Sequence, residues 1–498
     1  MNNSVSKNVL VNFLGRGWGA LLSIALTPVY IKFLGIEAYG LIGVFITLQS
    51  LLSILDMGLG TAANREMAVL SIRQENLPQI RNFVRTLEWV YWGMAIFICI
   101  LVSLLAYPIA HIWIKPQVLQ AHEINSAIVL MGVVLAAQWP SSLYGGALMG
   151  LQMQTLLNMI SMFFSTIRAV GAVFILWKIS SNIISFFIWQ ALVVLIQTLV
   201  TSWYLWHQVE HKTHKPKFEK NLLFETKKFA VEMSGITLMA AAFTQLDKIV
   251  LSRALTLEHF GYYYAASVAA SSLYIVISPI FSAIFPKFTQ LVSQQDKEKI
   301  KVLYEQASQL MALIILPLMM VLVFFSYDLL LLWTHSKITA TNGAIVLGLL
   351  AIGNALNGLM NVPYALQLAT GDAKTVLKLN AVLILISTPA IILLSAKWGG
   401  IGAASAWVGY TLAFWIINTM IVHNQFRYLD NRSWILNGFV KPLIISLLVT
   451  FTGYTINKII DSQNRWVNLT VIIFTIVTAI FATVISSPQV IRYMKGSK

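Results

Sequence analysis

The feature that most constrains the fold of this chain is a series of apolar stretches, each about as long as a membrane is thick. A bilayer core of about 30 Å takes roughly 20 residues of helix. Only 11% of the 498 residues are charged, about half the share found in soluble globular proteins. Without enough polar surface for water, the chain is predicted to be an all-α polytopic membrane protein with about fourteen transmembrane helices. The expected spans lie near residues 9–33, 39–62, 87–110, 124–149, 155–177, 182–206, 229–252, 260–286, 305–332, 340–368, 376–396, 400–423, 436–457 and 467–487.

Two of these spans contain a proline that is expected to interrupt the helix. Pro140 lies in the fourth span and Pro317 in the ninth. Neighbouring helices can satisfy the backbone groups that a proline frees. We therefore expect both spans to break and still cross the membrane.

The distribution of Lys and Arg predicts the orientation. Loops on the side of the N-terminus hold 23 of the 34 basic residues, and loops on the opposite side hold 8. Because cytoplasmic loops collect positive charge, both termini are predicted to be cytoplasmic. The net charge of +15 is then mostly a topology signal, and no nucleic-acid partner is expected. The N-terminal MNNSVSK shows no cleavable signal, so the first apolar stretch is expected to remain as an anchor.

The sequence contains an internal repeat. The stretch Lys32–Gly40 resembles Arg253–Gly261, with Glu37 matching Glu258 and Gly40 matching Gly261. The same offset along the chain pairs Gly150 with Gly371 and Trp177 with Trp398. Six expected helices separate the copies, so both share one orientation across the membrane.

This repeat predicts two parallel six-helix lobes, at residues 1–206 and 229–425. A basic cytoplasmic linker at 207–228 joins them, and an extra helix pair with a cytoplasmic tail follows at 426–498. Two lobes around a central cavity are the geometry of a transporter, since rocking them exposes a site to each side in turn. Duplication without transport is the alternative.

No enzyme motif is present. The sequence has no G-x-x-x-x-G-K-[ST] phosphate loop, no H-E-x-x-H and no G-x-S-x-G. The linker around 207–228 is too short for a catalytic domain, which argues against an enzyme. The single cysteine, Cys99, lies in an apolar run and excludes an intrachain disulfide and a cysteine metal site. We expect neither a metal nor an organic cofactor.

Three cations fall inside expected spans: Arg16, Arg168 and Lys248. A charge at mid-bilayer costs about 2.5–3.5 kcal/mol on insertion scales, so it normally faces a cavity or a partner. Each shares a helix face with polar or small residues, which are Asn12, Gly19 and Ser23 for Arg16, Asn158, Ser161 and Ser165 for Arg168, and Ser234, Thr237, Ala241, Gln245 and Ser252 for Lys248.

The small polar residues by themselves are better explained as helix–helix contacts. The cations are not, because packing needs no Arg, whereas an anionic group is bound well by a guanidinium with paired donors. We therefore predict a cavity for an anionic cargo. Asp247 lies about 100° round the helix from Lys248, so the two need not pair. Asp247 either pairs with a cation of another helix or takes up a coupling proton or sodium ion.

Several motifs resemble a known family. They are the F-L-G-x-E-x-Y-G hairpin at 33–40, the L-D-M-G-L-G at 55–60 followed by Asn64-Arg65-Glu66, and the Q-L-D-K at 245–248 followed by F-G-Y-Y at 260–263. These pieces are similar to the polysaccharide-synthesis and O-antigen flippase (Wzx-type) family. That family belongs to the multidrug/oligosaccharidyl-lipid/polysaccharide (MOP) exporter superfamily. The fourteen-helix plan extends the resemblance over the whole chain.

The resemblance implies a MATE-like fold and a flippase of the bacterial inner membrane. Such a flippase moves undecaprenyl-pyrophosphate-linked O-antigen units to the periplasmic leaflet by alternating access, with H+ or Na+ as the coupling ion. The glycan polymerase and chain-length machinery are the expected protein partners, and membrane lipids surround the chain. A sugar–pyrophosphate group needs this help because hydrocarbon offers its polar groups no hydrogen bonds.

Two matters stay open from the residues. Asp56 and Arg65, at the cytoplasmic end of the second helix, form a gate pair or merely cap the helix. The runner-up function is a multidrug/cation antiporter of the same superfamily, which should place acidic residues in its cavity. The basic excess inside the spans favours an anionic cargo, and a membrane scaffold would not need buried cations on several helices.

Overall fold

A computed structural model describes residues 3–56, 58–71, 77–209, 215–220, 245–460 and 464–486, with the backbone alone described for 3–16. All secondary structure in these ranges is helical, and they contain no strand. Within the described residues, eleven helices are long and apolar enough to cross a membrane. The all-α membrane fold is thereby confirmed. The count of fourteen stays a prediction, because the expected span at 229–252 falls mainly outside the described residues.

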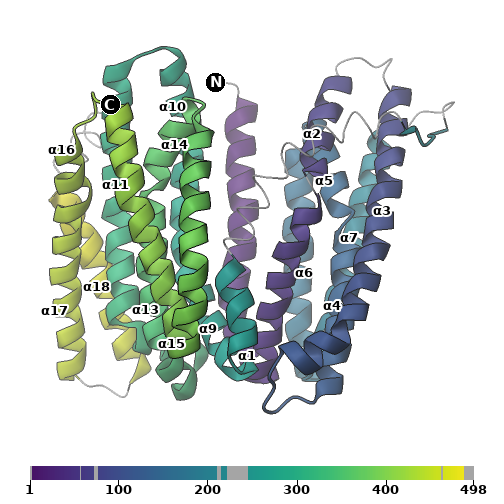
Figure 1. Ribbon diagram of the computed structural model, residues 1–498, viewed down its shortest axis with the longest axis horizontal. Coiled ribbons are helices and arrows are strands. Elements are labelled where there is room, and N and C mark those ends of the chain that lie inside the picture. The colour runs from purple at the N-terminus through teal and green to yellow at the C-terminus, as the bar shows by residue number, and fades with distance from the viewer. Residues whose placement is uncertain are drawn as a thin grey trace. The chain divides into compact units, whose positions relative to one another are not determined.

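The chain divides into two compact units, Met1–Gly261 and Tyr262–Lys498, and each is described here by itself. In the first unit, residues 245–254 are also helical and α9 begins before the boundary. The helices of this unit, most of them labelled in Figure 1, are α1 (Asn3–Leu52), η1 (Ser53–Asp56), α2 (Leu59–Leu70), α3 (Leu77–Pro108), η3 (Ile109–Trp113), α4 (Ala121–Gln138), α5 (Ser141–Gly150), α6 (Gln154–Lys178), α7 (Ile183–Gln208) and α9 (Leu257–Ala270).

The second unit continues from α9. Its helices are η4 (Ser271–Leu273), α10 (Tyr274–Ser293), α11 (Lys297–Phe324), α12 (Ser326–Thr334), α13 (Lys337–Leu359), α14 (Asn361–Ala369), α15 (Ala373–Gln425), α16 (Asn431–Ile435), η5 (Leu436–Val440), α17 (Lys441–Ile460) and α18 (Arg465–Ile485). The long α11 lies at its centre and packs against α10, α13, α17 and α18.

Glycines divide the two longest helices. Gly35 (φ 80°) interrupts α1 and Gly399 (φ 56°) interrupts α15, in the left-handed region that only glycine adopts cheaply. In α15 the chain reverses at this point, because Gln425 Nε2 near its end donates to Asp372 Oδ2 at its start, at 3.4 Å. The expected spans at 376–396 and 400–423 are therefore the two arms of α15.

Two expectations about helix limits were wrong. The second span does not run to residue 62, because its helix ends at Leu52 and Gly58 (φ 72°) separates it from α2. Pro317 does not interrupt the ninth span: it is buried within the continuous α11, and the break comes at Phe325. The break expected at Pro140 is confirmed, since α4 ends at Gln138 and α5 begins at Ser141.

The helices of the second unit repeat those of the first at the offset that pairs Gly40 with Gly261. The break between α4 and α5 after Gln138 recurs between α13 and α14 after Leu359. The neighbours recur as well: α2 packs on α5 and α3 on α4, as α10 packs on α14 and α11 on α13. These correspondences agree with the parallel repeat. The predicted limits of the four domains stay a prediction.

Candidate functional site

Arg168 is held in place by hydrogen bonds from two neighbouring helices. On α1, Trp18 Nε1 donates to Thr166 Oγ1 at 2.8 Å, and the Tyr30 hydroxyl donates to the carbonyl oxygen of Ala169 at 3.1 Å. On α7, Trp189 Nε1 donates to the carbonyl oxygen of Arg168 itself at 3.2 Å. The helix that carries Arg168 is therefore fixed between α1 and α7.

The guanidinium of Arg168 has no acidic partner. Its side chain is half-buried in a membrane-crossing helix, and no carboxylate among the described residues lies within ion-pair distance of it. Its charge interacts with Tyr30, which has no negative charge at neutral pH. A cation in this position is costly unless it meets an anion or water. The geometry therefore leaves the charge of Arg168 without a counter-charge among the described residues.

The polar residues predicted to share a helix face with Arg168 lie on α6, and those predicted to share one with Arg16 lie on α1. Ser161, Ser165 and Asn158 on α6 are half-buried, and Ser23 on α1 is exposed. The backbone of α1 is helical at residues 12 and 16, but the side chains of Asn12 and Arg16 lie outside the described ones. The bond between Trp18 and Thr166 marks where α1 and α6 touch. Residue 16 on α1 and residue 168 on α6 are each two residues from that contact, which is less than one helical turn.

Lys248 differs from Arg168 because it has a counter-charge. Its Nζ lies 3.4 Å from both carboxylate oxygens of the adjacent Asp247, and the side chains are 14% and 17% exposed. Adjacent residues on a helix point about 100° apart, which suggested that the two side chains need not pair. They do pair, because the lysine side chain is long and flexible enough to bend toward the carboxylate. Near them, Gln245 Oε1 is buried without a hydrogen-bond partner in the described part of the chain.

Asp56 caps a helix in this structure. Its Oδ1 accepts a bond from the Tyr91 hydroxyl at 2.6 Å, and its Oδ2 accepts one from the backbone N–H of Gly60 at 3.3 Å. Gly60 is in the first turn of α2, where free N–H groups favour a carboxylate. Arg65 is exposed on the same helix. These contacts favour the capping interpretation, and a gate role for the two residues stays a prediction.

Glu88 is a buried carboxylate that the sequence analysis missed. Its Oε1 accepts bonds from the Tyr144 hydroxyl at 2.9 Å and Trp206 Nε1 at 2.8 Å. Its Oε2 pairs with Arg85 at 2.9 Å. The four residues come from α3, α5 and α7, so the carboxylate ties three helices together. In the sequence Glu88 is a single acidic residue near the start of an apolar span, and nothing there indicates that it joins three helices.

Glu37 is a second buried carboxylate without a predicted role. It accepts hydrogen bonds from the backbone N–H groups of Gln117 at 2.6 Å and Val118 at 2.8 Å, and a longer one from Leu119. It thereby holds the loop between η3 and α4. Its place in the repeated hairpin was a signal that the sequence did contain.

The same loop also binds the turn that precedes α9. The backbone N–H of Leu257 donates to the carbonyl oxygen of Lys115 at 2.9 Å, and Trp113 Nε1 donates to Ser252 Oγ at 3.0 Å. Arg253 donates to the carbonyl oxygen of Ile112. We call residues 112–119 the latch loop, because they join the first hairpin to the turn at 252–257.

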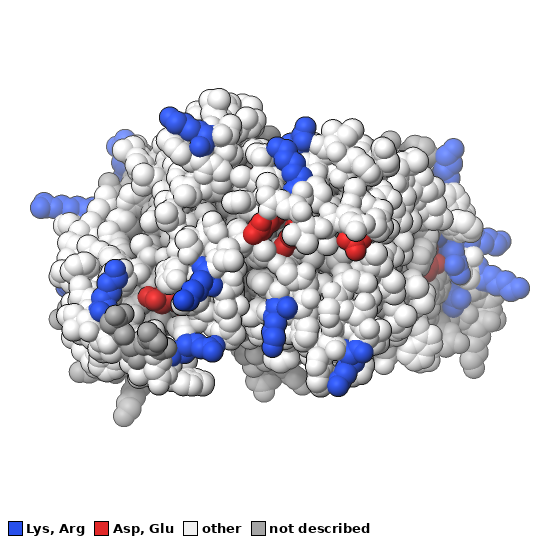
Figure 2. All heavy atoms as spheres, turned by 90° about the horizontal axis from the view of Figure 1, so that it is seen from below, with Lys and Arg blue, Asp and Glu red and all other residues white. Residues whose placement is uncertain are grey.

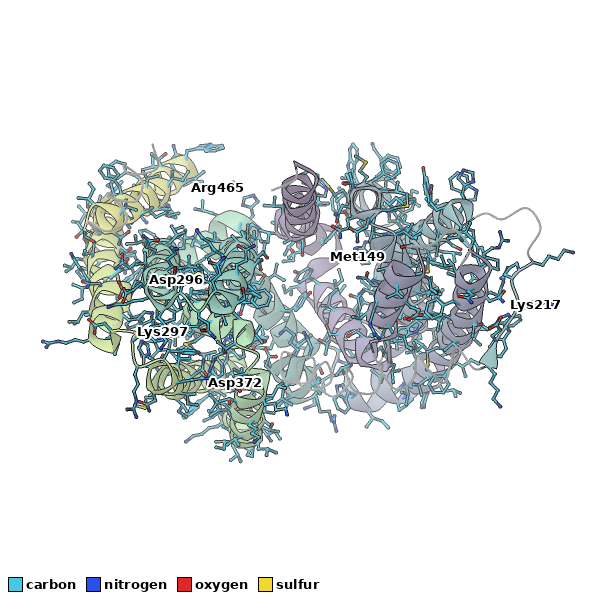
Figure 3. All side chains as sticks on the ribbon, turned by 90° about the horizontal axis from the view of Figure 1, so that it is seen from above. Met149, Lys217, Asp296, Lys297, Asp372 and Arg465 are labelled. Carbon is cyan, nitrogen blue, oxygen red and sulfur yellow. The ribbon has the colours of Figure 1, made fainter. Side chains whose placement is uncertain are left out.

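Part of the expected linker is also held in place. The backbone N–H of Lys217 donates to Asn82 Oδ1, and that of Glu219 donates to Thr86 Oγ1, both at 2.9 Å. Figure 3 shows Lys217 at the edge of the first unit, and Asp296 and Asp372 at helix ends in the second. The two aspartates cap α11 and α15.

Lys and Arg are spread over the part of the surface that the structure describes (Figure 2). Figure 2 shows Lys and Arg scattered over the face seen from below and closer together at its right-hand edge, with few Asp and Glu between them. Some lie on aromatic rings, as Lys178 does on Trp177 at 3.8 Å and Lys397 on Trp398 at 5.0 Å. Both tryptophans are exposed, as expected for rings in a membrane interface.

The sequence matches a known family over most of the first unit and the start of the second. Residues 5–292, more than half of the chain, match the model of the family described as polysaccharide biosynthesis protein. The chain belongs to that family. It is also 22% identical over 410 residues to a putative O-antigen transporter of Shigella flexneri, covering 81% of this chain and 94% of the relative.

Solved structures show the same fold. The lipid II flippase MurJ in an inward closed conformation is 16% identical, with a TM-score of 0.71 over 97% of this chain and 99% of MurJ. An inward-facing multidrug resistance MATE family transporter of the MOP superfamily is 13% identical, with a TM-score of 0.63 over 83% of this chain and 95% of that one. The expected MATE-like fold of a multi-pass membrane protein is confirmed.

Proposed function

We propose that this chain is a flippase that carries undecaprenyl-pyrophosphate-linked O-antigen units from the cytoplasmic to the periplasmic leaflet of a bacterial inner membrane. The observation that carries the proposal is Arg168, a half-buried guanidinium without a carboxylate partner among the described residues of a membrane-crossing bundle. The family and the similarity to a putative O-antigen transporter support this cargo class.

The residues then act by replacing water around the cargo. The Arg168 guanidinium donates paired hydrogen bonds to the pyrophosphate, and Arg16 on the neighbouring α1 adds a second cation. The hydroxyls of Ser161 and Ser165 bond to sugar oxygens. The polyprenyl tail stays in lipid, since it gains nothing from a polar cavity. Both termini are cytoplasmic, and the polymerase and chain-length machinery receive the flipped unit.

The proposed cycle is alternating access driven by an ion gradient. The paired Lys248 and Asp247 contribute less to pyrophosphate binding than Arg168, because part of the lysine charge is already compensated. A multidrug/cation antiporter is the competing function. The buried acids Glu37 and Glu88 do not favour it, since their oxygens are occupied by hydrogen bonds from backbone, Tyr144, Trp206 and Arg85.

A complementation experiment tests the proposal. A strain that lacks its own O-antigen flippase receives wild-type protein or Arg168→Ala, Arg168→Lys, Arg16→Ala or Lys248→Ala, and surface glycan is compared at equal protein levels. We expect the largest loss for Arg168→Ala, partial export for Arg168→Lys and a smaller loss for Lys248→Ala. Lys178→Ala, a cation on an exposed tryptophan ring, is the matched control and should export normally. Normal export by every Ala variant contradicts the proposal, as does drug resistance without glycan export.

A further inference from the structure

A group of buried polar atoms without partners lies in the second unit, far along the chain from Arg168. It consists of Tyr304 and Ser308 on α11, His423 at the end of α15, and Trp434 on α16, whose side chains are all at least nine-tenths buried. The Tyr304 hydroxyl, Ser308 Oγ, His423 Nε2 and Trp434 Nε1 make no hydrogen bond in the described part of the chain. Leaving one such group unbonded costs about 1–3 kcal/mol.

These side chains face one another. The His423 ring centroid lies 5.3 Å from that of Trp434 and 5.8 Å from that of Tyr304, and the last two rings are 6.2 Å apart. Ser308 is one turn after Tyr304 on the same face of α11. Buried polar atoms in proteins nearly always have a hydrogen-bond partner. Four unbonded polar groups that come together from three helices therefore need an explanation other than imperfect packing.

The histidine is oriented so that one nitrogen is left for another role. Nδ1 lies 2.9 Å from the carbonyl oxygen of Thr419, which can only accept, so Nδ1 carries a hydrogen. In the neutral ring Nε2 is then the free acceptor, with its lone pair directed away from that bond. A proton is the simplest species that this lone pair can take up.

The surroundings can hold the imidazolium that would result. The indole of Trp434 is within the roughly 6 Å over which an aromatic ring attracts a cation. The Tyr304 and Ser308 hydroxyls are neutral groups that can each donate or accept a hydrogen bond, and neither bonds to Nε2 in the described part of the chain. Among the charged groups of the elements packed here, Asp430 is the one that interacts electrostatically with His423, and Glu305 in turn interacts with Asp430.

We propose that His423 Nε2 is a proton-binding site and that the proton is the coupling ion of this transporter. Protonation forms one N–H bond from the Nε2 lone pair, releases nothing else and adds one positive charge to the cluster. Sodium fits the same atoms poorly, because hard cations take about six oxygen ligands and this group offers only two hydroxyl oxygens beside an imidazole and an indole N–H. The coupling role rests on the proposed flippase function, but the proton site does not.

Proton binding is tested first, without any glycan. Purified protein labelled at histidine Cε1 is titrated by NMR, and the His423 resonance is assigned by its loss in His423→Gln. We expect this resonance to titrate reversibly within about pH 5–8, with a shifted midpoint in Tyr304→Phe, Ser308→Ala and Asp430→Asn. The exposed His122 is the matched control, and its resonance should not respond to these three substitutions. A His423 resonance that stays fixed across the range overturns the proposal.

Coupling is tested next in vesicles that contain the protein and a lipid-linked glycan. An imposed pH gradient should accelerate flipping by wild type and His122→Gln, whereas His423→Gln should lose the response to the gradient and keep any residual flipping without it. If His423→Gln does not fold, Tyr304→Phe and Ser308→Ala are used in its place. In both variants the dependence of the flipping rate on pH should be shifted relative to wild type. A sodium gradient that drives wild type while a pH gradient does not overturns the coupling role. Failure of flipping itself in wild type would instead contradict the proposed function, leaving the NMR result standing.

Discussion

Gly40 and Gly261 make reciprocal close contacts with each other's turn. A Cβ atom on Gly40 would lie 2.7 Å from the carbonyl oxygen of Leu257, and a Cβ atom on Gly261 would overlap the carbonyl oxygen of Ile36. Leu257 and Gly261 are the counterparts of Ile36 and Gly40 in the internal repeat. The repeat therefore meets itself through equivalent atoms, as the two sides of a two-fold interface do.

Adding a methyl group to either glycine should separate these turns. We expect Gly40→Ala and Gly261→Ala each to destabilise the folded protein by about 1–3 kcal/mol, because the obstacle is backbone that cannot turn aside. The double variant should cost less than the sum, since both substitutions open one contact. Thermal unfolding in detergent measures this.

Gly93→Ala is the control for those two variants. A Cβ at Gly93 meets no atom within 4 Å, so alanine should leave the protein equally or more stable through its better helix propensity. Equal melting temperatures for Gly93→Ala and Gly261→Ala would refute the close contact.

Glu37→Gln should loosen the latch loop. The amide keeps one acceptor oxygen and replaces the other by a donor, which cannot pair with a backbone N–H. We expect faster hydrogen exchange at Gln117 and Val118 and reduced glycan export at normal protein levels. His122→Gln, an exposed substitution just beyond the loop, should change neither. Unaltered exchange in Glu37→Gln would show that the carboxylate does not hold the loop.

Two adjacent glycines on α5 should respond oppositely to alanine. A Cβ on Gly146 would overlap the carbonyl oxygen of Gly60 on α2, whereas a Cβ on Gly145 would lie 3.8 Å from Leu157, an ordinary contact. We expect Gly146→Ala to lower the melting temperature and glycan export, and Gly145→Ala to be neutral or stabilising. A reversed order would place a different face of α5 against α2.

Glu88 and Tyr144 should behave as a coupled pair. Removing the carboxylate in Glu88→Leu takes away the acceptor that the buried Tyr144 hydroxyl and the Trp206 N–H use, at about 1–3 kcal/mol for each bond. Tyr144→Phe should therefore be destabilising in wild type and much less so in Glu88→Leu. A double-mutant cycle on unfolding midpoints measures the coupling, and additive effects would argue against the bond.

The sequence by itself determined the membrane environment, the helical class and the parallel repeat. Apolar stretches as long as a bilayer is thick leave a chain only the helix as a way to satisfy its backbone in lipid, so periodicity and length were sufficient. The motif around Glu37 and Gly40 recurs around Glu258 and Gly261, so the sequence also showed both copies of the hairpin. It could not say that the copies touch, since contact between segments so far apart along the chain is not a local property.

The tertiary structure decided what the individual polar residues do. Arg168 and Lys248 read alike in the sequence, and the structure separates them: Asp247 compensates Lys248, and no carboxylate among the described residues reaches Arg168. Glu88 and His423 gave little signal in the sequence, because most of the side chains around them come from other helices. A side chain's charge and hydrogen bonds depend on neighbours brought together by packing, and that information is spread over the whole chain.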